Sequence, residues 1–208
     1  MPDPVCVRCR GTLRTPETDG AWTCDAHGVV EPLHPALPAE AYHLSDAASS
    51  SAVPVWVPRP IPSGWALSGV RRTGGTGASR AVAVALMGPG ITARQAELVI
   101  AAEEPGVGLG ASFAGLDSTD PGPEFASLPS DTKVTAGGRP APLWSLPVSD
   151  RAVYVGEAGG LWLWAVVWPV EEWMVVHDDL RLVDARLAEH RALLAELPVA
   201  MLSPHLAG

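Results

Sequence analysis

Two pairs of metal-binding residue types stand at the same two-residue gap near the start of the chain. The four residues are Cys6, Cys9, Cys24 and His27. This gap lets both side chains of a pair reach one ion from a tight turn, and the glycines that follow, Gly11 and Gly28, allow the backbone to pass close by. A turn near Asp19, within the segment 12–23, would join the pairs as a hairpin. We therefore expect residues 1–34 to enclose one tetrahedral zinc ion with no open coordination position, which makes the ion structural.

This pattern resembles the zinc-ribbon family over residues 1–34, and the resemblance implies a bound Zn²⁺. His27 stands where many ribbons carry cysteine, so we expect acid to weaken metal binding, because the imidazole must be neutral to ligate. Two alternatives stay open: a redox-active thiol pair, and thiols that bind no metal. A thioredoxin-type pair would need a βαβ context, which the sequence around Cys6 and Cys9 lacks.

The charge of the chain bears on its partners. The formal net charge is −9, and over residues 1–34 three arginines face five carboxylates. Although ribbons often bind nucleic acids, this acidic balance disfavours a phosphate-binding surface and favours contact with a protein or a small ligand. Nucleic-acid binding ranks third, since it would require a basic face built from arginines of the larger domain. These are Arg59, Arg71, Arg72 and Arg80.

No feature of the sequence indicates export or a membrane. The first residues lack the basic and apolar regions of a secretory signal, so we expect a cytoplasmic protein. The longest dense apolar run, 161–168, is far shorter than the roughly 20 residues that cross a bilayer. We therefore expect no transmembrane helix and no membrane partner.

Proline and serine mark a boundary after the cysteine-bearing module. Residues 35–63 read as a linker, in which the small polar stretch 45–51 forms a flexible tether. In the following stretch, 53–62, alternating prolines exclude a helix and favour an extended strap across the next domain. The larger domain then occupies residues 64–208.

Strand patterns dominate that larger domain and predict an α+β fold with a mostly antiparallel sheet and a C-terminal helix. In the stretch 80–87 both alternating faces are apolar, which indicates a central strand. The stretch 96–103 reads as a strand, although Thr92 and Gln95 also resemble a helix capping box. The other expected strands are 65–70, 133–136, a hairpin of 151–155 with 161–168, and 173–176.

A C-terminal helix is expected from Asp178 or Asp179 to about Leu197, where Pro198 stops it. Its leucine stripe could pack on the domain or pair with a second copy of the chain. His177 before it could belong to a metal site, but acidic residues at a helix N-terminus explain the local sequence without one.

Several residues of the larger domain are candidates for ligand binding. Carboxylates could converge near the glycine-rich stretch 106–111, although the adjacent acids would repel a phosphate there and no convincing helix follows. Tryptophans alternate on one face of the strand 161–168, where they form either an aromatic platform or, by our preference, a core. The carboxylates are Glu103, Glu104, Asp117, Asp120 and Glu157, and the tryptophans are Trp162, Trp164 and Trp168.

The whole chain also resembles an uncharacterised actinobacterial protein family. The resemblance is carried by the ribbon and by the stretches 55–58, 64–65, 103–110, 139–144 and 160–169. Some members carry a phosphotransacetylase label, which would require a coenzyme A site and a basic pocket for acetyl phosphate, and this acidic chain displays neither. We expect a non-catalytic binding protein. The alternative is an enzyme with its site in the loops 106–131.

Overall fold

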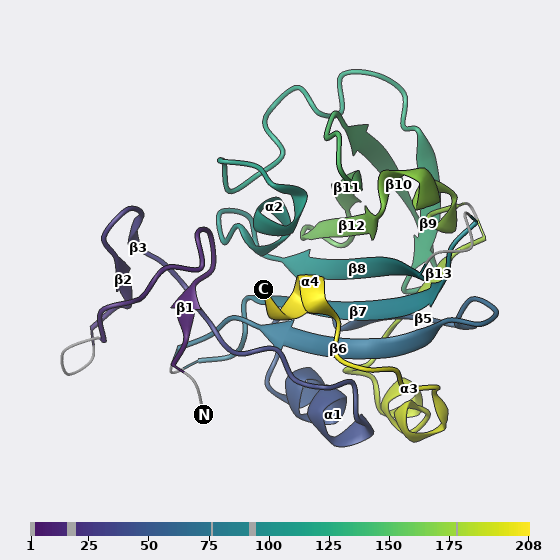
Figure 1. Cartoon of the computed structure of the whole chain (residues 1–208), viewed down its shortest axis with the longest axis horizontal. Helices are drawn as coiled ribbons and strands as arrows, with labels where there is room; N and C mark the ends of the chain where they lie inside the picture. Colours follow the sequence, from purple (N-terminus) through teal and green to yellow (C-terminus); the bar gives the residue numbers. More distant parts are fainter. Residues whose placement is uncertain (1–2, 16–19, 76, 92–94, 178) are drawn as a thin grey trace.

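One large sheet organises the molecule. The computed structural model describes residues 3–15, 20–75, 77–91, 95–177 and 179–208. Among these residues, nine strands form a curled sheet in which every neighbouring pair is antiparallel except β13 with β9. In sheet order the strands are β5 (Trp56–Pro58), β13 (Arg181–Asp184), β9 (Thr132–Ala136), β10 (Arg139–Leu146), β11 (Ala152–Glu157), β12 (Trp162–Trp168), β8 (Gln95–Glu103), β7 (Ala81–Pro89) and β6 (Ala66–Arg72). The predicted α+β class with a mostly antiparallel sheet is confirmed (Figure 1).

Both faces of the central strands are buried, as the sequence of β7 predicts. Val82, Val84 and Leu86 enter a first core, while alanines of the same strand enter a second core on the opposite face. Because β5 also contacts β7 and β8, the sheet curls so that its edge covers the first core. Burial on both faces explains the continuous apolar run of this strand.

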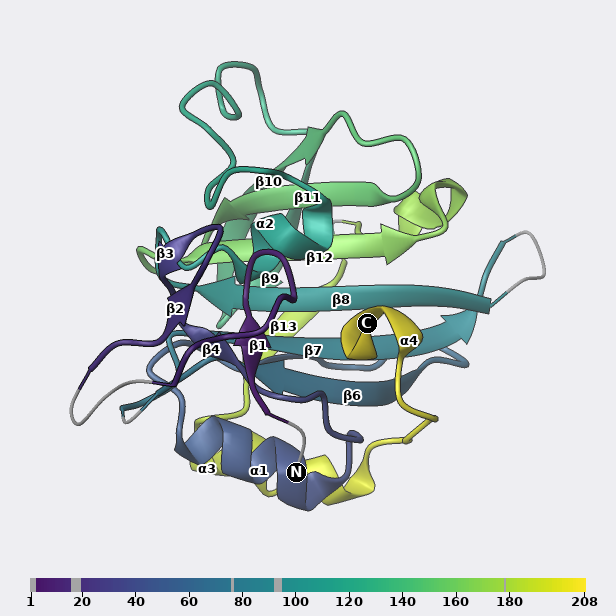
Figure 2. The ribbon, with the colours of Figure 1, turned by 60° about the vertical axis from the view of Figure 1, so that its left-hand side comes forward.

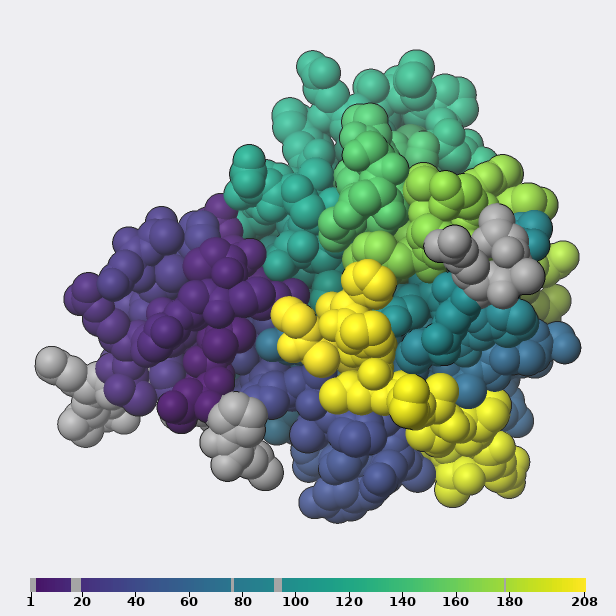
Figure 3. Space-filling model, viewed as in Figure 1, coloured from purple at the N-terminus to yellow at the C-terminus, as the bar shows by residue number. Residues whose placement is uncertain are grey.

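The second core is covered by short elements and by the N-terminal module. These elements are α2 (Leu109–Ala114) and α4 (Pro204–Ala207), and Val7 and Leu33 of the module pack beside them. Figures 1 and 2 show α4 in front of β7 and β8, on the same side of the sheet as α2. In Figure 3 the module is a lobe at one end of the molecule.

The expected flexible tether is wrong. Residues 45–49 belong to α1 (Ala41–Ser49), which packs against β6. Leu44, Ala47 and Ala48 are buried at helical spacing, so the alanines of this stretch form the apolar stripe of a helix and not a flexible tether. Within the expected strap, Trp56–Pro58 are extended and pair with β13 as β5.

The C-terminal third departs furthest from the prediction. Residues 173–176, expected as a strand, lie largely in the 3-10 helix η1 (Val170–Val175). The long helix expected from Asp179 to Leu197 is wrong in extent: β13 takes its first part, followed by α3 (Ala188–Arg191) and η2 (Leu194–Glu196). The period-two burial of Leu180, Leu182 and Asp184, paired between β5 and β9, outweighs the local leucine stripe.

Other elements follow their predicted patterns or were missed. The hairpin of β11 and β12 is confirmed, whereas the sequence analysis predicts no strand at β10, where Pro140 and Pro142 cannot donate to a ladder. Asp19, Thr92 and Asp178 lie outside the described residues. No helix in the described part of the chain combines the length and apolar character that crossing a bilayer requires.

Candidate metal centre

The four predicted ligands converge in the N-terminal module. Their donor atoms all lie within 4.8 Å of one another. Nδ1 of His27 is 3.6 Å from Sγ of both Cys6 and Cys24, and Sγ of Cys9 is 3.7 Å from Sγ of Cys24. Tetrahedral zinc with ordinary bond lengths would separate two sulfurs by about 3.8 Å and a sulfur and a nitrogen by about 3.6 Å. The residues therefore fit a zinc ion in both donor type and spacing.

Short ribbons of strand hold each pair. Cys6 ends β1 (Val5–Cys6), which pairs with β4 (Pro32–Leu33). Cys24 ends β2 (Thr23–Cys24), and His27 precedes β3 (Gly28–Val29), which pairs with β2. The first turn closes through hydrogen bonds from Arg10 N to Cys6 O, 2.9 Å, and from Cys6 N to Gly11 O, 2.8 Å. A Cβ atom at position 11 would stand 3.2 Å from Sγ of Cys9, so glycine gives this ligand its room.

The thiols are free and arranged for chelation. Sγ of Cys9 and Sγ of Cys24 are 3.7 Å apart, well beyond the roughly 2.05 Å of a disulfide bond. The backbone N–H of Ala26 and the His27 side chain lower the pKa of Cys24 to about 6, whereas burial raises the pKa of Cys6. Cys24 is thus a thiolate at neutral pH, which is the form that binds metal.

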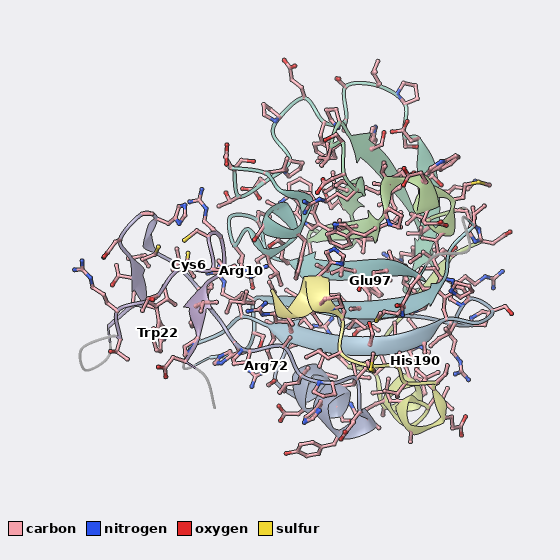
Figure 4. All side chains as sticks on the ribbon, in the orientation of Figure 1. Cys6, Arg10, Trp22, Arg72, Glu97 and His190 are labelled. Atoms are coloured by element: carbon pink, nitrogen blue, oxygen red, sulfur yellow. The ribbon has the colours of Figure 1, made fainter. Side chains whose placement is uncertain are left out.

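The first ligand turn also docks the module on the larger domain. Arg8 Nη2 donates to the carbonyl oxygen of Asp117 at 2.8 Å, and Ser112 Oγ donates to the carbonyl oxygen of Arg8 at 3.3 Å. The guanidinium of Arg10 lies 5.1 Å from the centre of the Phe113 ring. In Figure 4, Cys6 lies within the module and Arg10 lies on its side toward α2. Arg8 and Arg10, which lie between and beside the cysteines, therefore contact α2 and the loop that follows it.

The side chain of Glu103, the last residue of β8, lies at the N-terminus of α2. Its carboxylate is fully buried and accepts hydrogen bonds from Leu109 N at 2.6 Å and Gly110 N at 3.2 Å. Burial raises its pKa to about 8, against the lowering effect of these N–H groups and of the Trp164 indole, which does not complete a hydrogen bond of normal geometry. The expectation that no helix follows the glycine-rich stretch is wrong, and a side chain of the protein fills the place considered for a phosphate.

The remaining candidate carboxylates do not gather around Glu103 as one site. Glu104 pairs with Nε of Arg80 at 2.7 Å, and Asp117 and Glu157 are exposed. Asp120 is held by Trp162 Nε1 at 2.6 Å and by the backbone N–H of Gly106 at 3.0 Å, and its charge contributes to the raised pKa of Glu103. These contacts order the loop 106–120 rather than assemble an acid and a base.

The tryptophan face of β12 is mostly core. Trp164 is fully buried, and Trp168 stacks on His205 with 4.4 Å between ring centres. Only Trp162 is partly exposed, with Phe125 edge-on to it. The geometry supports the core interpretation for Trp164 and Trp168. Ligand binding stays a prediction for Glu103, Glu104, Trp162, Trp164 and Trp168.

One buried polar cluster gave no signal in the sequence. Glu97 accepts hydrogen bonds from Ser203 Oγ and lies 2.7 Å from Nδ1 of His205. Because 108 residues separate Glu97 from His205, no local spacing could reveal the pair. Ser203 also caps α4 by accepting from Leu206 N at 3.0 Å, which identifies the cluster as an anchor for the C-terminal segment.

The comparison with known proteins places the chain in a family whose function is not known. A family model described as "Family of unknown function (DUF6758)" matches residues 1–206. No curated protein and no solved structure matches the chain.

Proposed function

The chain belongs to this family of unknown function, and from that premise we propose that it is a non-catalytic binding protein whose N-terminal module is a zinc ribbon. The observation that carries the proposal is the spacing of the Cys and His donor atoms, which all lie within 4.8 Å of one another. Thiolates and an imidazole in a tetrahedral set favour zinc over the hard cations.

The role of the ion is structural. Three thiolates and one imidazole complete a four-coordinate shell, so no position remains for a catalytic water. Between the first two ligands lie Val7, which is fully buried in the second core, and Arg8, which donates to Asp117. By fixing the turn that carries these residues, the ion holds the module against α2.

The gap between the module and the larger domain is our candidate ligand site. It is a cavity of about 380 Å³, and the module supplies one wall from residues that flank the metal ligands. Zinc binding would therefore pre-form the wall that a protein or small ligand meets. Residues that carry the two walls are Arg8, Trp22 and Glu31 of the module, and Gly75, Arg80 and Val107 of the larger domain.

Two observations weigh against the competing functions. Both oxygens of Glu103, the carboxylate with the raised pKa, are taken by backbone N–H groups, so it has no free face for a substrate. Two of the four arginines considered for a nucleic-acid surface are engaged within the chain: Arg71 is buried and donates to the carbonyl oxygen of Leu206, and Arg80 pairs with Glu31 and Glu104. Both observations favour a binding protein, because these charged side chains are paired with groups of the same chain and are not offered to a substrate or a phosphate.

The test is the metal content of the purified protein under reducing conditions. We expect about one zinc ion per chain in the wild type, and loss of the ion in Cys9→Ser and His27→Ala, because each removes one of four ligands. His190→Ala is the matched control, since this histidine lies outside the ligand set, and it should keep its zinc. A wild-type protein that contains no zinc would sink the proposal and return attention to redox chemistry of Cys6 and Cys9.

A further inference from the structure

A second cavity is lined by residues of β9, β10, β11 and η1, elements that lie away from the N-terminal module (Figure 1). It has a volume of about 490 Å³, and the segment after η1 also lines it. None of its lining residues belongs to the metal module or to the cavity beside that module. What it binds is therefore a separate question from zinc.

Tyr154 provides an unpaired polar group on the cavity wall. The residue is only 7% exposed, and among the described residues its hydroxyl has no hydrogen-bond partner. Burial and the nearby Asp131 raise the pKa of Tyr154, so the phenol stays neutral at physiological pH. The hydroxyl oxygen is not one of the buried atoms that lack a partner, so it reaches the cavity and is open to a hydrogen bond from a bound group.

Asp131 provides a fixed negative charge beside this hydroxyl. Its Oδ2 accepts hydrogen bonds from Ser145 N at 2.7 Å and Ser145 Oγ at 2.9 Å, which holds the carboxylate in one orientation and leaves Oδ1 available. Asp179 adds a second carboxylate to the lining. The described lining residues include no lysine or arginine, and the neighbouring Lys133 is not among them.

Trp173 and Met174 form an apolar rim on η1. Their exposed fractions are 51% and 53%, in a chain that buries most of its other tryptophans. An exposed indole beside carboxylates suits a cation, because the ring face attracts positive charge and the carboxylates neutralise it.

We propose that this cavity binds an organic cation, an ammonium or guanidinium group carried on an apolar stem. The charged head meets Asp131 Oδ1 and the phenol oxygen of Tyr154, and the stem packs on Trp173 and Met174. The group can come from a free amine or from a lysine or arginine side chain of a partner protein, since the recognised chemistry is the same.

The experiment is an NMR titration of the full-length zinc-loaded protein with n-butylammonium, n-butylguanidinium and, as the neutral analogue, 1-pentanol. We expect saturable shifts from the cations and weaker binding of 1-pentanol. Asp131→Asn should weaken cation binding by about fivefold or more and Trp173→Leu by about threefold. Tyr154→Phe should also weaken it, and all three variants should keep dispersed spectra.

Matched controls lie elsewhere on the surface. Asp117→Asn and Tyr42→Phe alter an exposed acid and an exposed tyrosine outside the cavity and should leave the affinities unchanged. A capped Gly-Gly-Arg-Gly-Gly peptide that binds about tenfold tighter than n-butylguanidinium would assign the group to a partner protein, and equal binding would assign it to a free amine. The absence of binding by both cations, equal binding of 1-pentanol, or affinities unaffected by Asp131→Asn would overturn the proposal.

Discussion

At the scale of single residues, Glu103 is a buried group whose ionisation affects the stability of the fold. Because a buried carboxyl group prefers its neutral form, it contributes more to the free energy of unfolding at low pH than at high pH. Its pKa rises from 4.5 to about 8 on folding, so the unfolded chain releases this proton first as the pH increases. Stability from this group is therefore complete below about pH 4.5 and declines as the pH rises toward 8.

This sign leads to a prediction for Glu103→Gln. The wild type should lose up to about 1.4 kcal/mol of unfolding free energy per pH unit from this group between pH 4.5 and 8. The variant, whose side chain does not ionise, should lack that contribution. Urea denaturation across this pH range measures the difference between the two curves. Parallel curves would contradict the assignment, and Glu157→Gln, at an exposed position, should track the wild type.

At the scale of elements, α2 depends on one close contact with β12. A Cβ atom at position 110 would lie 2.1 Å from Cδ1 of Trp164, so only glycine lets the helix rest on the indole. We expect Gly110→Ala to lower the unfolding free energy by about 1–3 kcal/mol, because the helix or the ring must move. Gly77→Ala, where a Cβ meets open space, is the control in the same urea experiment. If Gly110→Ala were as stable as Gly77→Ala, the helix α2 would be able to move away from the indole without cost, which would contradict the prediction.

Elements were predictable where local pattern and tertiary environment agree. The two apolar faces of β7 predicted a central strand, the alternation in β12 predicted the arm of a hairpin, and the spacing of Cys6 to His27 predicted the Cys and His cluster, because each pattern is complete within a short stretch. The pattern was misleading for β13, whose leucines suit a helix until β5 and β9 pair with it. The cation cavity was invisible for a related reason, since Asp131, Tyr154 and Trp173 meet only after the sheet forms.

At the scale of the whole molecule, the metal module and the sheet meet through α2, and this arrangement predicts the effect of metal removal. Chelation of zinc should release the turn that carries Arg8 and Arg10, and with it the contacts to α2. We expect faster amide hydrogen exchange in residues 5–13, 22–33 and 108–116, and unchanged protection in β7 and β12. Restoring zinc should restore protection. Faster exchange throughout the chain, or no change in exchange in these segments, would contradict a local structural role for the metal.

The pairing of β5 with β13 also sets the order in which parts of the nascent chain can fold. The backbone N–H of Val55 donates to Asp184 across 129 residues of chain, and β5 has β13 as its sheet partner. A nascent chain therefore exposes the N-terminal module and β5 while the ribosome is still translating β13, the strand that pairs with β5. The Cys and His donors are complete by residue 27, whereas closure of the sheet requires β13, so β5 stays an unpaired edge in the interval between the two.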